Sequence, residues 1–168
     1  MRPDLTRVPA YYHNYINQAV GEDLNQILQE QAVSFRKFLD ELPPSKRDHR
    51  YAEGKWSIKE LLQHIVDAER VFSYRALCIA RKDTTPLPSF DENHYQDNAK
   101  TENRDWDDLV EEFSVTRHST VILFRSFDEE QLEATGTASN ASNYVRAFGF
   151  IIAGHVAHHL KIIRERYL

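Results

Sequence analysis

Apolar residues recur at helical spacing along almost the whole chain, and only five glycines interrupt the pattern. Four amphipathic segments each predict a helix: residues 23–42, residues 57–82, a segment that begins near 105 and carries apolar residues to 127, and residues 142–166. Ser57-Ile58-Lys59-Glu60 has the pattern of a capping box, and Pro43-Pro44 stops the first helix. We expect the tyrosine-rich first 22 residues to form a short helix that packs on the bundle.

The lengths of the connections predict the topology. The first and last links hold about 14 residues each, which suits antiparallel neighbours. The link over residues 83–104 is longer, contains Pro86 and Pro88, and is able to travel the height of a bundle. We therefore predict an all-α four-helix bundle of up-down-down-up order, a single domain over residues 1–168. In this order the start of the second helix lies beside the end of the fourth.

Composition narrows the class of protein. The chain has 168 residues, 41% hydrophobic and 28% charged, with a net charge of −5, which fits a soluble globular protein and disfavours nucleic-acid binding. Cys78 is the only cysteine, which excludes an intramolecular disulfide and a cysteine-based zinc finger. We see no apolar leader and no stretch approaching a membrane span, so we expect no membrane partner and a cytoplasmic location.

Two histidines lie on the apolar side of the fourth helix. At about 100° per residue, His155 and His159 fall within its apolar stripe and His158 on its shoulder. A buried imidazole needs a partner, which is either a metal ion or a carboxylate or carbonyl group. His64 flanks the stripe of the second helix, at the end predicted to face the other two. Three neutral nitrogen ligands leave a divalent metal an open position for water or substrate. Val156 stands where an H-E-x-x-H metalloprotease motif has the glutamate that acts as general base, so the sequence does not predict a metalloprotease of that class.

Glu69 is a second anomaly, because it falls near the centre of the apolar stripe of the second helix. One interpretation is a buried ion pair with Arg117. The other is a carboxylate that orients a ligand imidazole or acts as a general base. Asp67 either accepts a hydrogen bond from His64 or lies on the surface. Cys78 is predicted to be a core residue rather than a nucleophile.

Two further features bear on access and assembly. The loop over residues 90–95 is expected to return to the metal end and line its pocket. The first helix and the segment before it carry more aromatic residues than one stripe requires, which predicts a homodimer. These residues are Tyr11, Tyr12, Tyr15, Phe35 and Phe38. The alternative is that the tyrosines pack over their own bundle as a lid.

The run from Lys55 to Arg70, followed far downstream by Gly154 to His159, resembles the DinB superfamily, and most closely its branch of YfiT-like hydrolases that are thought to depend on a metal. The resemblance covers nearly the whole chain and implies the same up-down-down-up four-helix bundle. An HxxDxE run matches at His64, Asp67 and Glu69, so Glu69 belongs to the family pattern. The metal-binding triad of the family falls on His64, His155 and His159.

The resemblance limits the activity less tightly than the fold. Members of the family include S-transferases that use low-molecular-weight thiols, a thiol-dependent isomerase and domains of sulfur-transfer oxygenases. We therefore expect a metal-dependent enzyme with a small-molecule substrate, either a thiol S-transferase or a hydrolase. It would use one divalent ion, and imidazole ligands do not choose among zinc, nickel, manganese and iron. The alternative is a non-enzymatic metal-binding or stress-response module in which the site is structural.

Overall fold

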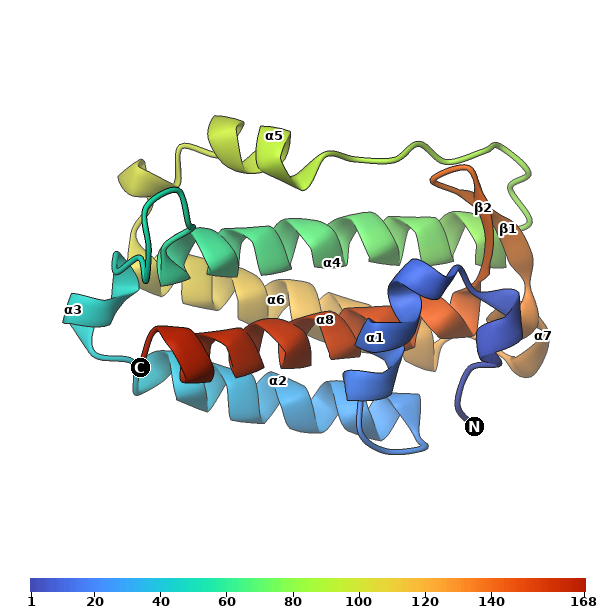
Figure 1. Cartoon of the computed structure of the whole chain (residues 1–168). Helices are drawn as coiled ribbons and strands as arrows, with labels where there is room; N and C mark the ends of the chain where they lie inside the picture. Colours follow the sequence, from blue (N-terminus) through green and yellow to red (C-terminus); the bar gives the residue numbers. More distant parts are fainter.

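The computed structural model describes residues 1–168 and consists of a bundle of four long helices with shorter elements at its ends and side (Figure 1). The long helices are α2 (Leu24–Asp40), α4 (Ile58–Ala80), α6 (Trp106–Arg125) and α8 (Val145–Arg166). The all-α bundle predicted from the sequence is therefore confirmed. The short helices are η1 (Leu5–Arg7), α1 (Ala10–Gln18), α3 (Pro44–Arg47), α5 (Glu92–Asn98), η2 (Thr101–Asn103) and α7 (Glu129–Glu133).

Three of the long helices begin where a side chain caps the free backbone N–H groups of their first turn. Asp23 accepts hydrogen bonds from two backbone amides of α2, and Asp105 does the same for α6. Ser57 and Glu60 form the predicted capping box of α4, with each side chain bonded to the other's backbone amide. Local sequence signals thus set these three starting points.

The directions of the helices match the predicted order. In Figure 1, α2 and α8 run from right to left, while α4 and α6 run from left to right. The crossover between α4 and α6 travels along the outside of the bundle and carries α5 and η2. The last turns of α8 therefore lie at the same end as the first turns of α4.

One part of the topological prediction is wrong. The helices joined by moderate links are antiparallel, but they are not neighbours. Both α2 and α4 pack against α6 and α8, which places α2 diagonally opposite α4. The reason is that each link folds into its own elements, α3 in the first and α7 with a β-hairpin in the second, and these carry the chain across the end of the bundle.

The hairpin is a second correction. Residues 142–144, expected to open the last helix, form part of strand β2 (Ala141–Tyr144), which pairs antiparallel with β1 (Thr135–Ala138). Ser139 and Asn140 form the turn with φ angles of 54° and 59°, the left-handed conformation that two-residue hairpin turns require. Tyr144 then becomes the N-cap of α8.

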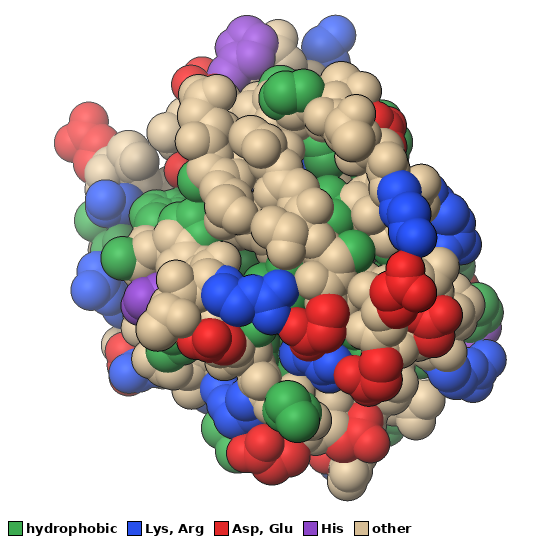
Figure 2. All heavy atoms as spheres, turned by 90° about the vertical axis from the view of Figure 1, so that its right-hand side faces the viewer, with side chains coloured by type: hydrophobic (Ala, Val, Ile, Leu, Met, Phe, Trp, Pro, Cys, Tyr) green, Lys and Arg blue, Asp and Glu red, His purple; other side chains and the backbone are tan.

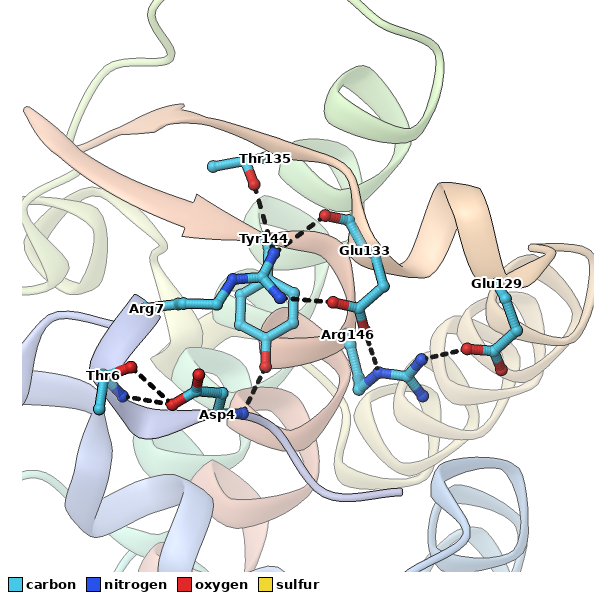
Figure 3. A network of polar contacts seen from close by, with 8 residues as sticks. All are labelled: Asp4, Thr6, Arg7, Glu129, Glu133, Thr135, Tyr144 and Arg146. Carbon is cyan, nitrogen blue, oxygen red and sulfur yellow. Dashed lines mark hydrogen bonds and ion pairs between the residues drawn. The ribbon is translucent and has the colours of Figure 1, made fainter.

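The N-terminal segment is tied to this end of the molecule by polar contacts (Figure 3). The backbone N–H of Asp4 donates to the hydroxyl of Tyr144 at 2.6 Å. Arg7 forms an ion pair with Glu133, and Glu133 also accepts from Arg146 at 2.8 Å. These contacts fix η1 against the hairpin and α7, and so direct the following helix, α1, along α8.

Helices α1 and α8 approach closely because α8 has a glycine at their crossing. A Cβ atom at Gly154 would lie 1.7 Å from the backbone carbonyl oxygen of Tyr15. We expect Gly154→Ala to push α1 away and to make residues 1–22 sensitive to limited proteolysis. Gly54→Ala is the control, since a Cβ there meets nothing within 4 Å, and its cost of about 1–2 kcal/mol comes only from a left-handed backbone. Equal protection of the N-terminal segment in both variants would contradict this packing role.

The surface bears on the predicted partners. Of the aromatic residues that suggested a dimer, Tyr12 and Phe35 are buried, Tyr15 and Phe38 pack partly against the core, and Tyr11 remains 68% exposed. The homodimer stays a prediction. Figure 2 shows acidic and basic side chains side by side on the end face that carries the hairpin. None of the helices combines the length and apolar character needed to cross a bilayer.

Candidate metal centre

The fold brings together the three histidines that sequence analysis singled out. His64 lies two turns into α4, and His155 and His159 lie one turn apart on α8. The Nε2 atom of His155 is 2.9 Å from that of His64 and 3.0 Å from that of His159, and one nitrogen from each ring lies within 4.8 Å of the others. Tetrahedral ligands at zinc–nitrogen distances of about 2.0–2.1 Å are roughly 3.3 Å apart. The two spacings that involve His155 are close to this value, so the three rings can hold a single metal ion if His64 and His159, whose nitrogens lie within 4.8 Å, move slightly closer.

Burial keeps these imidazoles neutral. His155 and His159 are only 6% and 8% exposed. Desolvation lowers the pKa of His64 to about 4 and holds the pKa values of His155 and His159 well below their usual value, with the neighbouring histidines adding to the effect. Each ring therefore keeps a free lone pair at neutral pH, which is the form that binds a metal ion.

Aromatic rings hold the histidines from the sides. The ring of Trp56 lies 5.0 Å from that of His64, and the ring of Tyr15 lies 5.5 Å from that of His155. The Nδ1 atom of His159 is buried with no hydrogen-bond partner. Packing, rather than a set of hydrogen-bonded carboxylates, is thus the observed support of the site.

A cavity of about 480 Å³ opens onto all three histidines. Its other walls come from α1, α4, the crossover and the hairpin. The crossover prediction is correct in part, because Glu92 and Asn93 line this cavity, whereas His94 and Tyr95 line a neighbouring depression. The aromatic residues of the cavity wall are Tyr11, Tyr12, Tyr15, Trp56, Phe72 and Phe90.

The two acidic candidates on α4, Glu69 and Asp67, form hydrogen bonds with residues other than the three histidines. Both carboxylate oxygens of Glu69, which is 2% exposed, accept hydrogen bonds of 2.8 Å from Arg117, which also donates to Gln31. Glu69 does not line the cavity, so its contacts are those of the buried ion pair. Asp67 accepts from Gln63 at 3.0 Å, and the suggested bond from His64 is absent.

Cys78 and His158, the other two residues considered for the site, lie outside the cavity. One residue of the cavity wall, Arg75, was not identified from the sequence. Cys78 is buried in the core, as predicted. His158 packs against Tyr15 and contacts Gln18. Arg75 lines the cavity although sequence analysis did not single it out. The available signal was its position eleven residues after His64, which places both on one face of α4.

The lowered pKa values predict how the metal-free protein responds to acid. In the unfolded chain these histidines become protonated near pH 6.5, whereas in the folded chain His64 becomes protonated only near pH 4. The unfolded state thus binds more protons in this window, so the free energy of unfolding falls as the pH drops below 6.5, by about 1.4 kcal/mol per pH unit and histidine. Urea denaturation of chelated protein at several pH values measures the slope. We expect His64→Gln to reduce it, and an unchanged slope would contradict the assignment.

Comparison with known proteins identifies a family and a structural relative. A family model described as the DinB superfamily matches residues 27–163. YfiT from Bacillus subtilis has the same fold with a TM-score of 0.71 at 16% sequence identity, over 84% of this chain and 85% of that chain. Its structure is described as that of a probable metal-dependent hydrolase with an unusual four-helix bundle topology. No match was found among curated proteins.

Proposed function

Because the chain belongs to the DinB superfamily, we propose that it is a metal-dependent enzyme that acts on a small molecule. In this proposal His64, His155 and His159 hold one divalent ion. The observation that carries it is the opening of the cavity onto these three histidines, whose Nε2 atoms cluster around that of His155. Structural zinc sites are closed by four protein ligands, whereas catalytic sites keep a position open to solvent or substrate.

The protein's own groups bind and orient, while the nucleophile comes from outside. When bound, the ion supplies Lewis-acid chemistry and lowers the pKa of a water or thiol ligand. No cysteine or lysine lines the cavity, and the one serine of its wall, Ser139, accepts a hydrogen bond from Arg75 and is not bonded to a general base that would activate it. Aromatic side chains line the cavity, and the packing of α4 on α8 keeps the three imidazole rings in place. The protein thus offers a site for an incoming nucleophile rather than a nucleophile of its own.

The identity of that nucleophile separates two candidate reactions. Hydrolysis is the first candidate, since the structural relative is described as a probable metal-dependent hydrolase. Transfer of a low-molecular-weight thiol is the second, and the volume of the cavity, about 480 Å³, admits a small thiol beside an electrophile. A purely structural metal site would have no adjoining cavity, so the cavity favours an enzyme over a non-enzymatic module.

Activity assays test the proposal. Metal-loaded protein without a histidine tag is assayed with chromogenic esters and amides, and with a panel of thiols against 1-chloro-2,4-dinitrobenzene. We expect turnover in one of the two series. In His64→Ala we expect the activity to fall by about 100-fold or more, because replacing a hydrogen-bond partner of a metal ligand already lowers metal affinity or activity 10–100-fold, and losing the ligand itself costs more. His158→Ala is the matched control. Activity that survives in His64→Ala would contradict the proposal, and inactivity of loaded protein in both series would favour the non-enzymatic module.

A further inference from the structure

Arg75 is a buried positive charge without a negative partner. Its side chain is 2% exposed and lines the cavity that contains the histidines. The other buried arginines are neutralised, Arg117 by Glu69 and Arg146 by Glu133 together with a second glutamate. No carboxylate lies within 4.0 Å of the Arg75 guanidinium. Because burying an unpaired charge is costly, this arrangement calls for an anion from outside the chain.

The contacts of Arg75 leave part of its guanidinium free. Its Nη2 atom donates to the carbonyl oxygen of Pro88 at 2.7 Å and to Oγ of Ser139 at 2.9 Å, and both acceptors are neutral. The Nη1 and Nε atoms have no protein acceptor, and they are not among the polar atoms sealed from solvent without a partner. Since Arg75 lines the cavity, these donors are available to a ligand bound there. The rings of Phe72 and Phe90 flank the group, with centroids 5.6 and 5.8 Å from Cζ.

Helix geometry places this charge and the histidines along one wall. His64, Ala68, Phe72 and Arg75 all line the cavity and follow one another at helical spacing. Eleven residues make three turns of α4 plus about 20°, with a rise of about 16 Å. Side chains on a helix lean toward its N-terminus, so the guanidinium leans toward the histidine end. Phe72 lies between the two groups, and its ring centroid is 6.4 Å from that of His155.

Two hydroxyl groups border the guanidinium. Tyr12 and Arg75 line the same cavity and both pack against the ring of Phe72. Burial raises the pKa of Tyr12 and the positive charge of Arg75 opposes that rise, so the phenol stays protonated at neutral pH. Ser139 accepts a bond from Arg75 and keeps its own O–H free to donate. Glu92 is the one acidic residue that lines the cavity. A single positive charge opposed by this carboxylate suits a ligand group with one negative charge, not two.

We propose that Arg75, Tyr12 and Ser139 form a subsite for the carboxylate of a small-molecule ligand whose other end reaches the histidines. The proposal rests on the proposed function and narrows it to substrates or thiols that carry a carboxylate a few bonds from the reacting atom. Arginine suits this task because its N–H groups form charge-assisted hydrogen bonds with a carboxylate.

Binding of simple probes tests the subsite. The affinities of 3-phenylpropanoate, the uncharged 3-phenylpropanamide and phenyl phosphate are measured by calorimetry at pH 7.5, with protein as purified and after chelation. We expect the carboxylate to bind both preparations and to bind about tenfold or more tightly than the amide or the phosphate, the size of effect that one charged hydrogen bond gives. Since the probes hold no thiol and the chelated protein no metal, this result does not depend on the metal proposal.

Variants identify the group responsible. Arg75→Gln keeps an amide to donate to Pro88 but removes the charge, and we expect carboxylate binding to weaken at least tenfold, with Arg75→Lys recovering part of it. Arg125→Gln removes an exposed arginine outside the cavity and is expected to bind as the wild type does. Equal binding of carboxylate and amide by the wild type would overturn the proposal even if Arg75→Gln failed to fold. Loss of carboxylate binding on chelation, or tighter binding of phenyl phosphate, would overturn it as well.

Discussion

His155→Ala is expected to abolish stoichiometric metal binding. Its Nε2 atom lies within 3.0 Å of the corresponding atoms of both other histidines, so its loss removes the central ligand. Changes to hydrogen-bond partners of metal ligands cost 10–100-fold in affinity, and loss of a ligand is expected to cost more than about 100-fold. Elemental analysis of untagged protein measures the result, with about one divalent ion per chain in the wild type and close to none in the variant.

His158→Ala provides a close control for that experiment. His158 is adjacent in sequence to His159 but lies outside the cavity, against Tyr15. We expect this variant to keep its metal. That result would show that the metal loss in His155→Ala is specific to the ligand position and is not a general effect of replacing a histidine on α8. Equal metal content in wild type and His155→Ala would refute the assignment. The same elemental analysis identifies the ion, because three imidazole ligands alone do not determine which divalent metal is bound.

Breaking the ion pair between Glu69 and Arg117 is expected to destabilise the fold strongly. Glu69→Gln leaves Arg117, which has no exposed surface, as an uncompensated buried charge. Loss of one partner of such a pair costs about 3–5 kcal/mol of the free energy of unfolding. Urea denaturation measures the loss. Asp40→Asn, which breaks an exposed pair with Arg36, is the control and is expected to cost less than about 1 kcal/mol.

Two further measurements separate a structural role of Glu69 from a role at the metal. Replacing the whole pair by apolar residues, Glu69→Leu with Arg117→Met, is expected to recover most of the lost stability, because no charge remains buried. Metal content of the folded Glu69→Gln protein is expected to stay near that of the wild type. A folded variant with full stability and no metal would instead assign the carboxylate to the orientation of a ligand histidine.

Some of the site could be read from the sequence because it depends on periodicity within single helices. His155 and His159 are four residues apart, so they share a face of α8 whatever surrounds it. The capping box at Ser57 fixes the start of α4 and hence the depth of His64 along it. The length of the crossover between α4 and α6 predicted that these two helices are parallel, since only a long link can run back along the bundle from the end of one helix to the start of the next. Glu69 was recognised as a buried anomaly by the same periodicity.

Tertiary structure alone decided what surrounds the histidines. The hairpin turn at Ser139 and the crossover carbonyl of Pro88 meet Arg75 from positions 64 and 13 residues away in the chain. The sequence determined the helices, their directions and the three histidines, because local hydrogen bonding and hydrophobic periodicity act over a few residues. Contacts between segments far apart in the chain decide the diagonal placement of α2, the hairpin, the cavity and the free charge within it. The pattern of residues within a single helix cannot predict such contacts.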